Sequence, residues 1–345
     1  MGNQLKMTNP TSHRNGALRG VVAVGASAGG VEALTDFTAN LPADLPYAIL
    51  VVLHVPANAP SVLAQILDRN GPLPATAARS DTPLEPGTIT VAIPNRHLLV
   101  DDHRMVLSEG PTENGYRPAI NALFRSVALT FGPRAVGVLM SGVLDDGVSG
   151  VSAIRARGGT TVVQSPDDAL FAAMPRNALA AGCVDYQAAA KEIGSLLQEL
   201  AGREREEPDM ERDARMELEN LIAMAPKYST EFDGEQLGSP SGYTCPDCNG
   251  SLMSVTDKDF RCRVGHAWTA DHLLKARDVE IEGALWIALR SLQEKAKLSR
   301  RLATNVGPGG LRQTYNEAAE EADRAMNTLS RRLMETTSEA GEPGG

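Results

Sequence analysis

The sequence predicts an α/β fold: a doubly wound, mainly parallel sheet, followed by a small cysteine-rich module and a helical hairpin. Three observations support this prediction. Short apolar runs alternate with helix-type patterns from Arg19 to about Leu200, as in parallel sheets covered by helices on both faces. Three of the four cysteines cluster after residue 243, and two helical stretches flank a glycine-rich turn near residue 308. We expect domains at 19–200, 243–274 and 279–336.

The individual elements follow in chain order. The expected strands are Val21–Gly25, Ala48–Leu53, Thr88–Ile93, Ala135–Met140 and Thr160–Val163, which are short and rich in β-branched residues. The expected helices, between or after them, are Gly30–Asn40, Pro60–Arg69, Pro118–Thr130 and Val148–Arg157. The segment Leu98–Leu107, centred on Asp101-Asp102, has the pattern of an inserted hairpin.

Composition and charge narrow the function classes. The chain has 345 residues, of which 42% are hydrophobic, enough for one large core and a smaller module. Its formal net charge of −10 argues against nucleic-acid binding, which needs clustered Lys and Arg. No apolar run reaches the ~20 residues of a membrane helix, so we expect no membrane insertion. Residues 1–18 are polar, without a signal-peptide core, and we expect a disordered leader. The few, clustered cysteines are typical of the reducing cytoplasm, the expected location.

The segment from Gly25 to Gly29 is the first candidate site. Ser27 lies where an apolar strand must turn into a helix, between small residues that let the backbone bend. This pattern is typical of a nucleophile elbow, which exposes a serine hydroxyl near helix-terminal amides. The alternative is a glycine-rich phosphate turn of a nucleotide-binding unit.

A serine nucleophile needs a base and a group that orients the base. His54 ends the run Ala48–Leu53, and Asp145 and Asp146 follow the run Ala135–Met140. All of these positions fall at the carboxyl ends of expected strands, the edge where open α/β sheets carry their sites. Either aspartate could orient the imidazole, or the two could cap the following helix. The order Ser, His, Asp differs from the Ser, Asp, His order of ordinary α/β-hydrolases.

Five motifs together resemble the CheB-type methylesterase domain, the protein-glutamate methylesterase of bacterial chemotaxis, over about residues 19–200. They are Gly25-Ala26-Ser27-Ala28-Gly29-Gly30, Leu53-His54-Val55-Pro56, Arg117-Pro118, Ser141-Gly142…Asp146-Gly147 and Met174-Pro175-Arg176. The resemblance implies that Ser27 is the nucleophile, His54 the general base and Asp146 its orienting acid, because Asp146 directly precedes the glycine.

The resemblance also implies the chemistry. Ser27 would attack a glutamyl methyl ester of a chemoreceptor or related signalling protein, methanol would leave, and glutamine could be deamidated by the same route, without a cofactor. Backbone amides near Ala28 and Val143 are the implied oxyanion donors. Arg117, Met174 and Pro175 would shape the substrate groove or serve the structure alone. The alternative function is a non-catalytic scaffold that binds protein partners.

This chain departs from the family pattern at three points. Ala28 stands where the family often has threonine, and Val143 where methionine is common. Only about 18 polar residues precede the first strand, so we expect no receiver domain and no regulation through phosphorylation of one.

Residues 201–242 form an expected acidic linker. Between 201 and 240 there are eleven acidic and five basic residues. Within it, residues 210–225 could form an amphipathic helix with Leu218, Leu221, Ile222 and Met224 on its apolar face.

The cysteine-rich module carries the spacing C-x2-C-x13-C-x3-H, formed by Cys245, Cys248, Cys262 and His266. Two ligands on a tight turn and two after a short hairpin suit a tetrahedral zinc ion. We expect structural zinc, since the protein would fill all four positions. The alternative is a set of reduced thiols. The module resembles a zinc-ribbon-like extension of some CheB homologues.

Two helical stretches end the chain, Val279–Thr304 and Leu311–Thr336, joined by a glycine–proline turn. Leu285, Leu289, Leu292 and Ala296 have the spacing of a packed helix face. We expect these helices to pack on each other, with self-association as an alternative.

Overall fold

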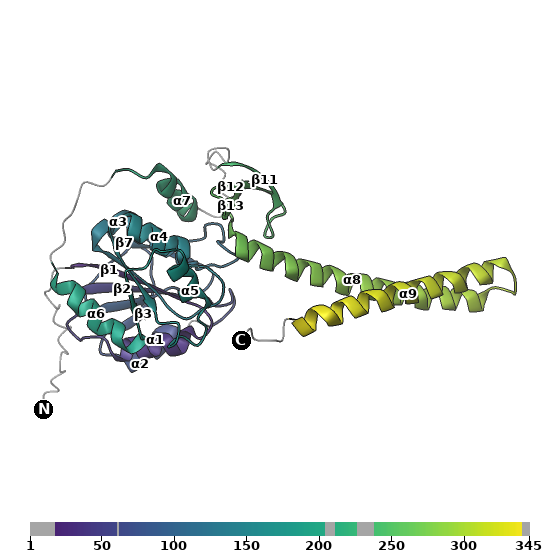
Figure 1. The fold of residues 1–345 in the computed structure, drawn as a ribbon, viewed down its shortest axis with the longest axis horizontal. Coiled ribbons are helices and arrows are strands. Elements are labelled where there is room, and N and C mark those ends of the chain that lie inside the picture. Colours follow the sequence, from purple (N-terminus) through teal and green to yellow (C-terminus); the bar gives the residue numbers. More distant parts are fainter. Residues whose placement is uncertain (1–17, 61, 204–210, 226–237, 340–345) are drawn as a thin grey trace, which may run out of the picture. The chain divides into compact units, whose positions relative to one another are not determined.

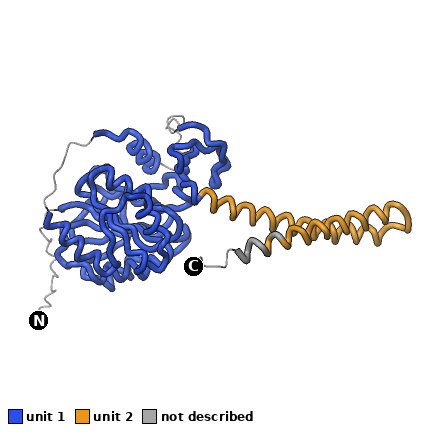
Figure 2. The backbone as a smooth tube through the Cα atoms, in the orientation of Figure 1, with its two compact units in different colours: residues 1–272 blue, residues 273–345 orange. Residues whose placement is uncertain are grey.

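The computed structural model describes residues 18–60, 62–203, 211–225 and 238–339. They form two compact units, residues 1–272 and 273–345 (Figure 2). The first unit contains a seven-stranded sheet in the order β10-β9-β8-β1-β2-β5-β3, in which every pair of neighbours is parallel (Figure 1). The strands are β1 Gly20–Ala26, β2 Tyr47–Leu53, β3 Ala75–Ala77, β5 Thr88–Val91, β8 Ala135–Leu139, β9 Thr160–Gln164 and β10 Tyr186–Ala188. The predicted fold class is confirmed.

Helices cover both faces of this sheet (Figure 1). One face packs against α1 Gly30–Ala39, α2 Leu63–Asn70 and α6 Ala190–Gly202. The other packs against α3 Ile120–Phe131, α4 Val148–Ala156 and α5 Ala173–Ala180, with the short helix η1 Gly132–Arg134 after α3. Successive side chains of β1 alternate between the two cores, Val22 and Val24 into one, Val21 and Ala23 into the other, because strand side chains have a period of two. Burial on both faces explains why this strand is continuously apolar.

A separate three-stranded sheet consists of β4 Thr82–Pro83, β7 Arg104–Ser108 and β6 His97–Asp101. The predicted hairpin is its β6–β7 pair, and Asp102 and His103 have the positive φ values of its tight turn, 43° and 60°. The side chain of His97, the first residue of β6, is fully buried. Burial lowers the pKa of its imidazole, and Nε2 lies 2.9 Å from the carbonyl oxygen of Pro111.

Part of the expected acidic linker is a helix packed on the domain, α7 Ala214–Met224. Met216, Ile222 and Ala223 are buried, whereas Leu221, predicted on the apolar face, is 62% exposed. The Ser108 hydroxyl donates to the carbonyl oxygen of Ala223 at 2.6 Å and ties α7 to β7. The predicted disordered leader lies outside the described residues except for Leu18, as do linker residues 204–210 and 226–237.

The cysteine-rich module, here residues 239–272, is an antiparallel four-stranded sheet. Its strands are β11 Ser239–Thr244, β12 Ser251–Ser254, β13 Asp259–Cys262 and β14 Ala267–Thr269. The module belongs to the same compact unit as the parallel sheet. Ala267 pairs with Glu113 in an isolated β-bridge, so the chain after the last cysteine–histidine ligand is joined to the loop before α3.

The second unit contains most of α8 Ala270–Asn305 and all of α9 Gly310–Glu339. The first helix begins nine residues before the expected Val279, directly after β14. Ala296 is buried, and the other residues of the predicted face are half-buried. Lys295 and Glu321 form an ion pair at 3.4 Å between the two helices. None of the helices in the described ranges has the length and apolar content needed to cross a membrane.

Candidate active site and metal centre

Ser27 lies on a tight turn between β1 and α1. β1 ends at Ala26 and α1 begins at Gly30, and between them Gly29 takes a left-handed conformation with φ 67°. A Cβ atom at Gly29 would lie 2.7 Å from the Ser141 hydroxyl, so only glycine fits without displacement. The Ser27 amide donates to the carbonyl oxygen of Ser141 at 2.9 Å. The sequence Ser27-Ala28-Gly29 thereby presents the serine at the carboxyl end of β1.

His54 reaches Ser27 because of the strand register. Ala26 of β1 pairs with Leu53 of β2, so the next residue of each strand emerges beside the other. The His54 amide donates to the carbonyl oxygen of Ala26 at 3.1 Å. The Nδ1 atom of His54 lies 3.2 Å from the Ser27 hydroxyl oxygen, which is hydrogen-bonding distance.

Asp146 lies on the other side of the imidazole. Its Oδ2 is 2.8 Å from Nε2 of His54, and both side chains are almost completely buried, with exposed fractions of 1% and 4%. This separation places the carboxylate in direct contact with the imidazole. Ser27, His54 and Asp146 are thus consecutive contacts, as in a serine–histidine–carboxylate triad.

Three further groups hold the Asp146 carboxylate. Oδ1 accepts from the side-chain amides of Asn114 at 3.0 Å and Asn121 at 2.8 Å, and Oδ2 accepts from the Ile120 amide at 3.1 Å. Burial by itself raises the pKa of Asp146, but His54, the charge of His272 and the Asn114 amide outweigh it, so the pKa is lowered. The carboxylate is therefore the stable form. Sequence reasoning missed both asparagines, since neither belongs to a motif.

The neighbouring Asp145 has a different partner. Its Oδ1 lies 2.7 Å from Nδ1 of His272 and accepts from the Thr269 hydroxyl at 2.8 Å. Both partners lie at the end of the cysteine-rich module. The two aspartates thus face different groups: Asp146, the acid that the family resemblance implies, contacts His54, and Asp145 contacts His272.

Tyr116 covers the face of the imidazole. The two rings are stacked, with centroids 3.7 Å apart and an angle of 5° between their planes. Burial, and then the charge of Asp146, raise the pKa of the Tyr116 hydroxyl. No sequence pattern marks Tyr116, although it directly precedes the Arg117-Pro118 motif.

A cleft of about 390 Å³ opens beside Ser27 and His54. Arg117 lines it, with its guanidinium donating to Asn95 Oδ1 and to the carbonyl oxygens of Glu109 and Gly110. Met174, expected in the groove or in a structural role, is fully buried beneath Gly142 and is not among the residues that line the cleft. In the described ranges, the amides of Ala28 and Val143 donate to no other group of the chain. The lining residues are Ser27, His54, Val55, Pro56, Ala57, Asn95, Thr112, Gly115, Tyr116 and Arg117.

The second candidate site lies in the cysteine-rich module. The ligand atoms of Cys245, Cys248, Cys262 and His266 all lie within 4.8 Å of one another. Cys248 and Cys262 have their sulfurs 3.7 Å apart, and Nδ1 of His266 lies 3.7 Å from Cys245 Sγ and 3.5 Å from Cys262 Sγ. With metal–sulfur bonds of about 2.3 Å, tetrahedral ligands lie about 3.8 Å apart. This cluster can therefore hold a metal ion.

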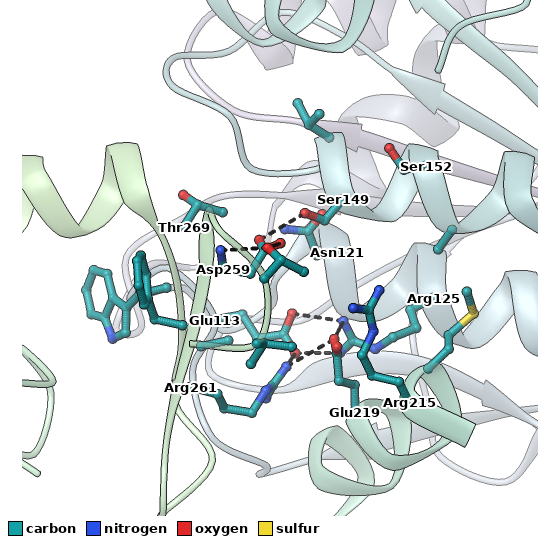
Figure 3. Close-up of a pocket in the computed structure, with 18 of the residues that line it drawn as sticks. Glu113, Asn121, Arg125, Ser149, Ser152, Arg215, Glu219, Asp259, Arg261 and Thr269 are labelled. Atoms are coloured by element: carbon teal, nitrogen blue, oxygen red, sulfur yellow. Dashed lines mark hydrogen bonds and ion pairs between the residues drawn. The ribbon is translucent and has the colours of Figure 1, made fainter. Parts of the chain in front are cut away.

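A buried ion-pair network joins the module to the domain (Figure 3). Glu113 lies between the guanidinium groups of Arg125 on α3 and Arg261 on β13, and Glu219 of α7 lies 3.3 Å and 3.5 Å from the same two groups. Burial would raise the pKa of Glu113, but Arg125 and Arg261 lower it to about 2. These residues line a cavity of about 340 Å³ between the module, α4 and α7.

The site thus combines a parallel sheet with Ser, His and Asp in contact beyond its carboxyl edge, in the chain order Ser27, His54, Asp146. The family model described as CheB methylesterase matches residues 22–197, just over half of the chain. The chain belongs to the CheB methylesterase family.

Several relatives were found. A protein-glutamate methylesterase/protein-glutamine glutaminase of Anaeromyxobacter dehalogenans is 44% identical over 167 residues, which are 48% of this chain and 49% of the relative. One from Symbiobacterium thermophilum is 38% identical over 46% of this chain and 44% of the relative. The aligned part of this chain thus spans about half the length of these curated relatives.

A solved structure is also similar. The crystal structure of the Thermotoga maritima CheB methylesterase catalytic domain superposes with a TM-score of 0.51 at 27% identity. The similarity covers 52% of this chain and 98% of that one.

Proposed function

We propose that this protein hydrolyses methyl esters of glutamyl side chains in a chemoreceptor or related signalling protein, and deamidates glutamine side chains by the same route. The observation that carries this proposal is the line of contacts from Ser27 through His54 to Asp146 beside an open cleft. Membership of the CheB methylesterase family and the names of the relatives support the substrate class.

In this mechanism Ser27 attacks the ester carbonyl while His54 takes the hydroxyl proton at Nδ1. Asp146, held as a carboxylate, orients the ring and stabilises the imidazolium that forms. The Ala28 and Val143 amides stabilise the oxyanion. His54 then gives the proton to the leaving methanol, and water attacks the acyl-enzyme by the reverse proton transfers. No metal or cofactor takes part in these steps.

Methanol release from a methylated chemoreceptor tests this proposal. We expect release by the wild type, loss of more than about 10³-fold in Ser27→Ala, and full release by Ser80→Ala, which changes an exposed serine in the turn before β4. Equal stability of the two variants would tie the loss to chemistry. A wild type that releases no methanol, with Ser27→Ala binding the receptor equally well, would instead support the scaffold alternative.

We propose that Cys245, Cys248, Cys262 and His266 hold a structural zinc ion. Three thiolates and one imidazole at tetrahedral separations suit zinc, and four protein ligands would leave no position for a substrate. Metal analysis of chelator-free protein should find about one equivalent of zinc. Cys262→Ser should lose it, whereas Cys183→Ser, a buried cysteine outside the cluster, should retain it.

Self-association through α8 and α9, the alternative to packing within the chain, is supported by apolar side chains that stay exposed on α8, among them Val279, Trp286 and Ile287. Light scattering of the full chain tests it, with a mass above that of one chain expected. A cytoplasmic location stays a prediction from the cysteine usage, and an intact-cell fractionation would check it.

A further inference from the structure

The cysteine-rich module is joined to the acid of the proposed triad by a short chain of hydrogen bonds. His266 precedes β14, and the Ala267 amide donates to the carbonyl oxygen of Thr112 at 3.1 Å. The Ala267 carbonyl oxygen in turn accepts from the Asn114 amide at 2.7 Å. The segment that follows the fourth cluster residue is thus paired with the loop that precedes α3.

The Asn114 side chain lies between this segment and the carboxylate. Its Oδ1 accepts from the Thr269 amide at 2.8 Å, and its Nδ2 donates to Oδ1 of Asp146 at 3.0 Å. Because one amide group makes both bonds, the Thr269 contact fixes which way the Nδ2 group points. Asn114 is buried, and its φ of 53° is a conformation that asparagine tolerates better than most residues.

The loop that bears Asp146 is held by the module at the adjacent residue as well. Asp145 accepts from the Thr269 hydroxyl and contacts His272. Two neighbouring acids are therefore tied to the same short part of the module, one directly and the other through Asn114.

We propose that Asn114 is a positioning residue through which the cysteine-rich module holds Asp146 against His54. The inference rests on the proposed hydrolase function. It assigns the module a role in the active site without placing its metal cluster near the reaction. When the module loosens, Asn114 loses its Thr269 partner and its amide turns, so Asp146 keeps Asn121 and Ile120 beside His54 but loses Asn114.

Two substitutions test Asn114 in the full chain. Asn114→Gly removes the side chain but keeps the left-handed backbone and the amide that donates to Ala267. It should lower kcat by about tenfold, typical for the outer partner of a functional group, with KM unchanged because Asn114 is absent from the cleft lining. Asn114→Asp keeps the shape but sets a second carboxylate against Asp146, so it should lower kcat further.

Ser149→Ala is the matched control. The Ser149 hydroxyl also joins the domain to the module, through Asp259 at 3.3 Å, but it does not touch Asp146. We expect its kcat within about twofold of the wild type. If Ser149→Ala loses as much as Asn114→Gly, any loosening of the module suffices and the assigned role of Asn114 is overturned.

Removal of the metal tests the link to the module. The readout is the rate at which a phosphonate ester labels Ser27. We expect chelation to slow labelling of the wild type about tenfold and to change Asn114→Gly little, because that variant has already lost the link. Equal slowing of both proteins contradicts the inference.

Hydrogen exchange of residues 141–147 separates this inference from the proposed function, because it needs no turnover. Faster exchange in Asn114→Gly than in Ser149→Ala supports the positioning role, and unchanged exchange overturns it. If the wild type neither releases methanol nor labels at Ser27, the proposed function fails, and the exchange result still decides whether Asn114 holds the loop.

Discussion

At the scale of single residues, His54 is held on three sides. The Ser27 hydroxyl and the Asp146 carboxylate lie at its two ring nitrogens, and Tyr116 covers one face. The imidazole has little freedom to rotate in this setting, because the ring is 96% buried and stacked. Orientation of the base is therefore built into the resting protein.

Removing the charge of Asp146 should lower kcat far more than removing the charge of the neighbouring Asp145. Asp146→Asn keeps the size and two of the contacts but removes the carboxylate, and an amide at this position of a serine triad typically costs about 10⁴-fold in kcat. We therefore expect kcat of Asp146→Asn to fall by about 10³- to 10⁴-fold. Asp145→Asn, one residue away and facing His272, should stay within about threefold. Comparable losses in both would contradict the assignment of Asp146.

The stacked ring of Tyr116 gives a second prediction at this scale. An aromatic pair contributes about 0.5–1.5 kcal/mol, so Tyr116→Ala should lower kcat about 2- to 12-fold by loosening His54. Tyr116→Phe keeps the ring and should retain activity within about twofold. An equal loss in both variants would assign the effect to the hydroxyl rather than to stacking. Steady-state rates of methanol release give this comparison.

At the scale of elements, the turn between β1 and α1 decides where the serine points. Gly29 has φ 67°, and its neighbours leave no room for a side chain: an added Cβ would lie 2.7 Å from Ser141 Oγ and 2.9 Å from Leu170 Cβ. The turn is therefore held by backbone conformation and by close packing at once.

Gly29→Ala and Gly182→Ala separate these two effects. Both glycines are left-handed, with φ 67° and 66°, but nothing lies within 4 Å of a Cβ at Gly182. Backbone strain should cost each variant about 1–2 kcal/mol. Gly29→Ala should be at least about 1 kcal/mol less stable than Gly182→Ala because of overpacking. A phosphonate ester should also label its Ser27 more slowly. Urea unfolding measures the stabilities, and equal losses would mean that Ser141 and Leu170 move aside.

At the scale of the molecule, a buried carboxylate joins three parts of the first unit. Glu113 precedes α3, and its partners come from α3 and β13, while Glu219 of α7 lies beside the same two guanidinium groups (Figure 3). Removing one partner of such a buried network leaves uncompensated charge, which costs several kcal/mol. Docking of the module therefore depends on Glu113.

This network predicts a specific dependence on pH. The pKa of Glu113 is about 2 in the folded chain and 4.5 by itself, so the unfolded chain binds the proton more readily. The stability from this group is complete above about pH 4.5, and about 3 kcal/mol is lost as pH falls towards 2. Glu113→Gln should be less stable than the wild type at pH 7 by a similar amount. Its stability should fall less than that of the wild type when the pH is lowered.

Urea unfolding at several pH values measures this difference. Glu199→Gln is the control, since Glu199 forms an exposed pair with Arg203 and should change stability by less than about 0.5 kcal/mol. If the free energy of unfolding falls equally in the wild type and in Glu113→Gln between pH 4.5 and 2, the acid sensitivity belongs to other carboxyl groups.

The sequence by itself predicted the parallel sheet and the strand ends at which Ser27, His54 and Asp146 emerge. Both follow from local patterns: buried parallel strands are continuously apolar, and their carboxyl ends share one edge. The roles of these three residues stay a prediction. The cysteine spacing likewise indicated the cluster, because its ligands lie within 22 residues of one another. The sequence left Met174 between a groove role and a structural role, and the structure buries it, because a single residue carries little evidence of burial.

Only the tertiary structure decided how the site is held. Asn114, Tyr116 and His272 belong to no motif, and their contacts join segments that lie from 32 to more than 120 residues apart. Periodicity describes which face of an element is buried, but not which distant element covers it. The sequence therefore determined which residues gather at the edge of the sheet. The tertiary structure decided which distant groups hold them, with Asn114 and Asn121 at Asp146 and His272 and Thr269 at Asp145.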